Sequence, residues 1–178
     1  MKIVDCHVHV NHYPHRGDVA KSLEAKISAL LQAMDSQNIN YSLILSSYKV
    51  NQNRPSTAQI IKHAKKYESR IGVVASFTID NGPSSLSEYR NWFKDDLIEG
   101  IKLYCGYEHY YPYDKRYQGI YDICIEYKKP VMIHTGDTYA SNAKIRFAHP
   151  LNIDEVAVDN PELKIVICHL GNPWTIDC

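Results

Sequence analysis

Two histidines separated by one residue lie at the very start of the chain. Residues 4–10, VDCHVHV, read as a buried β-strand that carries Asp5, His7 and His9. Because strand side chains alternate between two faces, these three residues are expected to share one face. Two neighbouring imidazoles could bind a metal ion. The pair alone is weak evidence, since nine histidines in 178 residues give roughly 0.4 such pairs by chance, and an exposed edge strand is the alternative.

Polar side chains also lie near the ends of three later apolar runs. Lys102 belongs to GIKLY, His134 ends PVMIH and His169 ends LKIVICH. Alternation groups His134 with Met132, and His169 with Ile167. If these faces line the interior of one barrel, the polar groups converge at its rim with the first-strand pair. Such clustering favours a metal site over satisfied core histidines.

The predicted chemistry is that of a catalytic metal centre. His7, His9 and His134 would supply three imidazole nitrogens, leaving an open position for water. A bound divalent ion, zinc or alternatively manganese, can lower the pKa of that water to roughly 7. His169 would take or give a proton, or polarise a substrate carbonyl.

Six apolar runs alternate with helical patterns along the chain. The runs, predicted as strands, start at residues 2, 41, 71, 100, 130 and 163. Apolar stripes of helical period lie within residues 23–34, 60–67, 86–97, 120–127 and 153–157. The alternation predicts βαβ units and a parallel sheet, and near-continuous runs such as IGVVASF and LKIVIC indicate strands covered on both faces.

The connections favour a barrel over an open sheet. Three strand-to-helix loops are long, whereas every helix-to-strand connection is short, as expected of a (β/α)₈ barrel with its functional loops at one end. An open doubly wound sheet usually has a glycine-rich first turn, and NHYPHRGD contains one glycine. We therefore expect an α/β fold, a single domain over residues 1–178, in which six of eight units are present.

Composition excludes several classes of function. Twenty basic and twenty acidic residues cancel, so nothing favours nucleic acid or a membrane surface as partner. No signal-peptide pattern or apolar membrane span is visible, and five cysteines without zinc-finger spacing favour reduced thiols. A cytoplasmic protein acting on a small molecule is expected, with a homo-oligomer as one option.

Four segments together resemble the amidohydrolase superfamily: VDCHVHV, EGIKLY, PVMIHTG and LKIVICHLGNPW. They are most similar to the amidohydrolase-related branch, which contains aminocarboxymuconate-semialdehyde decarboxylase, resorcylate-type decarboxylases and lactone hydrolases. The resemblance implies that His7, His9 and His134 bind the metal. It implies that His169 assists catalysis or binds a second metal. The family's strand-8 aspartate has no counterpart before Cys178.

Further positions are weaker candidates. Lys102 aligns with the carboxylated lysine of binuclear relatives, although an interior lysine that pairs with Asp5 or faces substrate is favoured. Tyr104, His149 and Trp174 are candidate substrate contacts. The seven tyrosines from Tyr104 to Tyr121 could form a lid or an ordinary surface loop. The sequence also contains two histidines just past the first strand, expected to be solvated: His12 and His15.

The leading functional prediction is a metal-dependent hydrolase of an amide, lactone or related carbonyl compound. A non-oxidative decarboxylase (a lyase) using the same site is the runner-up, and an inactive fragment or partner-dependent barrel is the third reading. Because such a barrel needs about 250 residues, we expect a truncated chain whose reading frame continues for roughly 70–110 residues.

Overall fold

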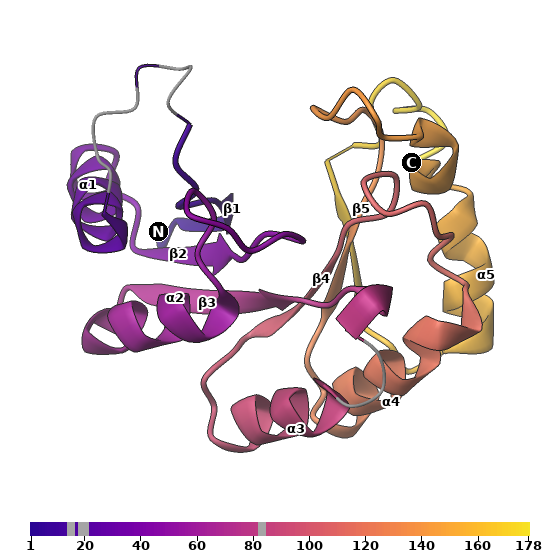
Figure 1. The fold of residues 1–178 in the computed structure, drawn as a ribbon, viewed down its shortest axis with the longest axis horizontal. Coiled ribbons are helices and arrows are strands. Elements are labelled where there is room, and N and C mark those ends of the chain that lie inside the picture. Colours follow the sequence, from indigo (N-terminus) through magenta and orange to yellow (C-terminus); the bar gives the residue numbers. More distant parts are fainter. Residues whose placement is uncertain (14–16, 18–21, 82–84) are drawn as a thin grey trace. The chain divides into compact units, whose positions relative to one another are not determined.

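The computed structural model describes residues 1–13, 17, 22–81 and 85–178 (Figure 1). The chain packs as two compact units. The first unit comprises Met1–Ser76 with Asp96–Glu99, and the second comprises Phe77–Asp95 with Gly100–Cys178. Each unit is described by itself below.

The first unit contains three parallel strands and two α-helices among its described residues. The strands β1 (Val4–Val8), β2 (Tyr41–Leu45) and β3 (Ile71–Ser76) pair in chain order. The helices are α1 (Leu23–Ser36) and α2 (Thr57–Ala64), the latter continued by a 3₁₀ turn η2 at Lys65–Tyr67. Serine begins each helix, because its side chain accepts a backbone N–H of the first turn. The predicted strands and helical stripes are confirmed here.

The second unit repeats the pattern. The strands β4 (Gly100–Leu103), β5 (Val131–His134) and β6 (Ile165–Cys168) are parallel and pair in chain order. Its α-helices are α3 (Leu86–Lys94), α4 (Gln118–Glu126) and α5 (Asn152–Asp159), and α3 lies beside α4 (Figure 1). Its described 3₁₀ turns are η3 (Ile79–Asn81), η5 (Lys115–Tyr117) and η6 (Ile145–Ala148).

Burial distinguishes the strands. Every residue of β3, β4 and β5 is buried, as the continuous apolar runs predict. The same expectation is wrong for β6, where Val166 and Ile167 remain 39% and 38% exposed, and for β1, which is buried only in part. Among the described pairings, β1 pairs within its unit only with β2, and β6 only with β5. An apolar sequence does not reveal which strand has a neighbour on one side only.

The first strand is also not a regular ribbon. Asp5 pairs with Ser42 and Val8 with Ile44, so β1 contains one more residue than β2 over this stretch. An extra residue of this kind is a β-bulge, which interrupts strict alternation. Strict alternation is therefore interrupted between Asp5 and Val8, yet the His7 and His9 side chains meet as expected.

Two further expectations concern the cysteines and the membrane. All five cysteines are free, as predicted, with Cys6 and Cys178 exposed. Among the described residues, no helix combines the length and apolarity needed to cross a bilayer.

The loops that follow β5 and β6 are joined through their backbones. Thr135 Oγ1 donates to the Cys168 carbonyl at 2.6 Å, and the Asp137 N–H donates to the Asn172 carbonyl at 2.8 Å. Between them, Gly136 has a φ of +82° and packs directly on the Asn172 carbonyl. A side chain at residue 136 would meet both an unfavourable backbone conformation and this oxygen.

We therefore expect Gly136→Ala to lower the free energy of unfolding by about 2 kcal/mol or more, combining left-handed strain with overlap. Gly17→Ala is the control, because Gly17 has a φ of +71° but, among the described residues, nothing within 4 Å of an added Cβ. Gly17→Ala should lower the free energy of unfolding by about 1 kcal/mol, through backbone strain alone. Urea unfolding measures both, and equal losses would contradict the packing argument.

Candidate functional site

The two first-strand histidines face each other. His7 Nε2 and His9 Nε2 lie 3.3 Å apart, and both rings are partly buried. His9 Nδ1 lies 3.0 Å from the carbonyl oxygen of Leu45, the last residue of β2. Because a carbonyl only accepts, Nδ1 of His9 carries the proton, and its Nε2 presents a lone pair toward His7.

This geometry fits a divalent metal ion. Two nitrogens that each lie about 2.0–2.1 Å from a tetrahedral ion are separated by roughly 3.3–3.4 Å. A metal-binding histidine usually donates its other ring N–H to a carbonyl or carboxylate, as His9 does to Leu45. A hydrogen bond from His7 to His9 gives the same separation, so metal analysis must distinguish the two.

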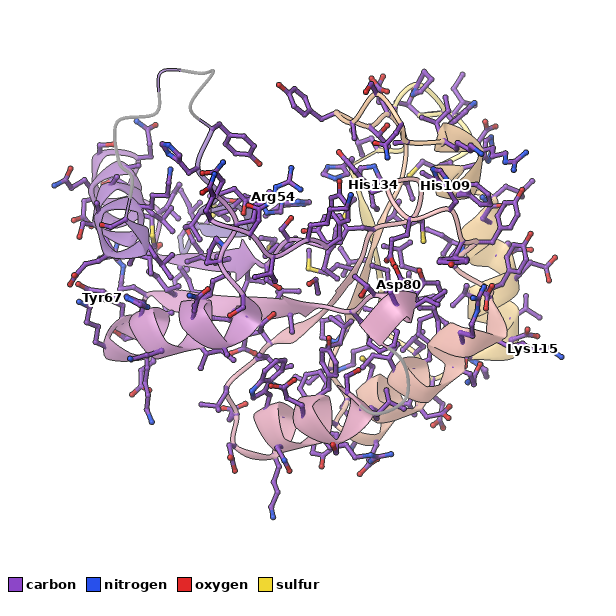
Figure 2. The ribbon with its side chains drawn as sticks, in the orientation of Figure 1. Arg54, Tyr67, Asp80, His109, Lys115 and His134 are labelled. Carbon is purple, nitrogen blue, oxygen red and sulfur yellow. The ribbon has the colours of Figure 1, made fainter. Side chains whose placement is uncertain are left out.

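The second unit places two further candidate histidines together. His134 ends β5 (labelled in Figure 2), and its ring centroid lies 4.8 Å from that of His169. His134 is buried, and its Nε2 lies 3.1 Å from the carbonyl oxygen of Asp137. In the neutral ring Nε2 therefore carries the proton, and Nδ1 has the lone pair that a metal ion would use.

The prediction that His169 continues the strand alternation of Ile165 and Ile167 is wrong. Its ring nevertheless contacts that of His134. The register pairs His134 with Cys168, so Cys168, not Ile167, shares the face of His134. The strand ends at Cys168, and His169 has a φ of +133°, outside strand geometry. This turn of the backbone allows the His169 ring to contact His134.

Lys102 is fully buried, unlike the other described Asp, Glu, Lys and Arg residues of the second unit. Its side chain is 0% exposed, and its Nζ has no hydrogen-bond partner among the described residues. Burial lowers the pKa of the Lys102 amine, and the nearby Cys168 thiol opposes this only in part. Burial thus disfavours the charged form of this amine, whose Nζ lies 5.5 Å from the centre of the buried Tyr104 ring. Carboxylation and substrate contact remain predictions.

His149 and Trp174 meet away from any strand. Their rings lie 4.5 Å apart, and His149 Nε2 lies 3.7 Å from an oxygen of Asp177. Leu151 donates its backbone N–H to His149 Nδ1 at 3.2 Å, so the proton of the neutral ring is on Nε2, facing Asp177. These contacts show how the loop after β6 packs on the segment before α5. Substrate contact by either residue remains a prediction.

The comparisons with known proteins decide the family. A family model described as amidohydrolase matches residues 4–176. The chain belongs to the amidohydrolase family. Members of this family are enzymes that generally use a divalent metal ion. A search of curated proteins finds no match.

Solved structures show the fold of this family member. An uncharacterized TIM-barrel protein from Bordetella bronchiseptica is 22% identical, with a TM-score of 0.74 over 99% of this chain and 70% of its own. A probable 2-pyrone-4,6-dicarboxylic acid hydrolase from Acinetobacter baumannii is 16% identical, with a TM-score of 0.64 over 96% and 59%. A manganese-bound 5-carboxyvanillate decarboxylase from Novosphingobium aromaticivorans is 13% identical, with a TM-score of 0.68 over 98% and 68%.

These likenesses confirm the predicted fold class. The protein has an α/β fold of the TIM-barrel type, of which the described residues contain six parallel strands. The chain spans between 59% and 70% of the length of the three structures. The expected continuation of the reading frame remains a prediction.

The tyrosines between Tyr104 and Tyr121 differ in their surroundings. Tyr117 and Tyr121 belong to the core, whereas Tyr113 is exposed. Tyr107 has the contact that sequence reasoning missed: its ring lies 5.0 Å from that of His134, and its hydroxyl accepts the Tyr139 N–H at 3.0 Å. The surplus of tyrosines indicated a wall or lid but could not single out one member.

Next to Tyr107, Glu108 is a partly buried carboxyl group that sequence reasoning also missed. Its Oε2 is buried without a hydrogen-bond partner among the described residues. Burial, with a smaller contribution from the negative charge of Asp80 in η3, raises the pKa of Glu108 to about 7, against a lowering hydrogen bond from the Ile79 backbone. The hydrogen bond from the Ile79 backbone thus links the loop of Glu108 to η3. Ionisation of Glu108 in this buried position costs free energy of folding.

This raised pKa predicts how stability varies with pH. Between the ordinary pKa of 4.5 and about 7, the folded protein retains a proton that the unfolded chain has lost, so stability falls as pH rises through this window. The loss reaches up to about 3 kcal/mol above pH 7. Glu108→Gln should flatten this part of the profile of thermal midpoint against pH, whereas the exposed Glu162→Gln should preserve it. An unchanged slope in Glu108→Gln would refute the assignment.

Proposed function

We propose that this protein is a metal-dependent hydrolase of an amide, lactone or related carbonyl compound. In this proposal His7, His9 and His134 hold one divalent ion, zinc or manganese, and His169 moves the proton. The substrate is a small molecule, and the cytoplasm is the proposed location. The family resemblance assigns the three ligands to one ion, and the local geometry of each histidine supports its role.

The observation that carries the proposal is the arrangement of the first-strand pair. The 3.3 Å separation of the two Nε2 atoms suits two ligands of one ion, and the Leu45 carbonyl fixes the tautomer in which His9 can bind it. His134 has the equivalent support from the Asp137 carbonyl. In both His9 and His134, one ring nitrogen therefore donates to a backbone carbonyl, and the other ring nitrogen has the lone pair that would bind the ion.

The chemistry divides between the ion and the chain. A divalent ion supplies Lewis acidity and lowers the pKa of a water to roughly 7. In this proposal His169 accepts a proton from the attacking water and returns it to the leaving group, and its ring contact with His134 supports the role. Tyr107 packs against the His134 ring, with the ring centroids 5.0 Å apart, and restricts how that ring can turn.

A decarboxylase that uses the same residues is the second candidate. Its support is the structural likeness to 5-carboxyvanillate decarboxylase, a protein solved with manganese. In that reaction His169 would deliver a proton to the carbon that loses carbon dioxide. Release of carbon dioxide without uptake of water distinguishes this candidate from hydrolysis.

Metal content provides the first test. The chain reconstituted with zinc or manganese should bind one ion, and the double variant His7→Ala/His9→Ala should lose it, because both lone pairs are removed. His63→Ala is the control, since this α2 histidine donates from Nδ1 to the Gln59 carbonyl of its own helix. Elemental analysis after dialysis decides: equal metal in the parent and the double variant would sink the assignment.

The role of His169 is tested separately. We expect His169→Asn to keep its metal and to lose about 10²–10⁴ in kcat, the usual contribution of a positioned proton-transferring histidine. Metal content and turnover are measured on the same preparation of the full-length gene product. Stoichiometric loss of metal in this variant would instead make His169 a ligand.

A further inference from the structure

The carbonyl group of Leu45, which lies 3.0 Å from His9 Nδ1, is itself held in position by its neighbours. The same peptide group continues as the N–H of Ser46, which donates to the Val74 carbonyl of β3 at 3.0 Å. Because a peptide group is planar, fixing the direction of its N–H also fixes the direction of its carbonyl. The contact of this peptide group with β3 therefore directs the Leu45 carbonyl toward β1, where His9 accepts its contact.

The Ser46 side chain adds a second set of contacts at this point. Its hydroxyl oxygen accepts the Ser76 N–H at 2.7 Å and lies 2.8 Å from Thr57 Oγ1, so one of these two hydroxyls donates to the other. Ser76 in turn donates from its own hydroxyl to the Ser47 carbonyl at 2.8 Å. All four residues are buried, and Ser46 is only 1% exposed. The chain therefore leaves β2 through a network of buried hydroxyl groups.

These hydroxyls join three elements of the first unit. Ser46 follows β2, Ser76 ends β3, and Thr57 is the first residue of α2. A buried hydroxyl or N–H that loses its partner is costly, so each bond of the network constrains the position of Ser46. A displacement of Ser46 would also turn the peptide group that it shares with Leu45.

The chain beyond β1 is held independently of this network. The last described pair of β1 with β2 involves Val8, and the His12 N–H donates to the Asn53 carbonyl at 2.7 Å. His12 was expected to be solvated, but its Nδ1 is buried, and His15 lies outside the described residues. Since His9 lies between these two attachments, its backbone is held on both sides. The carbonyl that its ring contacts then selects which ring nitrogen carries the proton.

We propose that Ser46 is a positioning residue for His9 and acts through the peptide group that it shares with Leu45. Thr57 and Ser76 support this role by holding the Ser46 hydroxyl. The role rests on the proposed function, in which His9 is a metal ligand. A carbonyl held in place keeps the proton on Nδ1, so the Nε2 lone pair remains available to the ion. Without a defined acceptor, a neutral imidazole populates both tautomers, and only one of them can bind through Nε2.

The tautomer of His9 provides the first test, in Ser46→Ala and Thr57→Val, which each remove one hydroxyl from the network. Nitrogen NMR of the metal-free full chain reads this tautomer at about pH 8, above the ordinary imidazole pKa of roughly 6.5. The parent should carry the proton on Nδ1 alone. Ser46→Ala should populate both tautomers, and Thr57→Val should shift the populations in the same direction by less.

Zinc affinity, measured by competition with a chromophoric chelator, provides the second test. Ser46→Ala should weaken zinc binding about tenfold, the lower end of the roughly 10–100-fold loss when a ligand loses its supporting partner, because the Leu45 carbonyl itself remains. Ser42→Ala is the matched control. This serine of β2 is 0% exposed, and its hydroxyl has no hydrogen-bond partner among the described residues. Ser42→Ala should keep the tautomer and the zinc affinity of the parent.

Two results would overturn the positioning role. One is a parent in which His9 populates both tautomers, and the other is a Ser46→Ala variant that matches Ser42→Ala in both measurements. A parent that binds no zinc would refute the proposed function, whereas the His9 tautomer in the same metal-free samples would still decide the role of Ser46. Circular dichroism confirms folding, and Thr57→Val replaces Ser46→Ala in the comparison if the latter does not fold.

Discussion

Parallel pairing in register decides which side chains of this protein meet. In the second unit, Lys102, Met132 and Val166 lie at one level on one face, and His134 and Cys168 lie one pleat further along it. The buried Cys168 thiol therefore lies near Lys102, and the His134 imidazole lies at the end of the sheet. Every loop beyond this level begins from a position that the backbone hydrogen bonds have already fixed. The two candidate histidines of this unit depend on that register.

The sequence predicts the elements because their signals are local. The 3.6-residue and two-residue periods of apolar side chains are properties of short windows, and they locate the described helices and strands of both units. The bulge in β1 and the positive φ of His169 are departures of the backbone from those periods. The residue types at these positions do not predict either departure. Alternation consequently predicted the presence of the histidine contacts but not the path by which His169 makes its contact.

Contacts between loops are harder to predict, because they depend on partners distant in sequence. Nothing in the run of tyrosines indicates that Tyr107, and not Tyr113, packs on His134. Glu108 is similar: an acidic residue in a polar loop is ordinarily solvated, and only the described packing shows its buried oxygen. The clearest sequence signals were thus the residue types that could do chemistry. Their surroundings, which determine protonation and orientation, required the structure.

The backbone junction between the loops after β5 and β6 has a consequence for how this scaffold can change. Residue 136 has no room for a side chain beside the Asn172 carbonyl, and a shift of one loop alone would break the hydrogen bonds of Thr135 and Asp137 to the other. An insertion in one would displace His134 or His169 unless the other loop moved by a corresponding amount. The two loops are therefore expected to change together, whereas Tyr113, exposed in the loop after β4, can be replaced without contact to this junction.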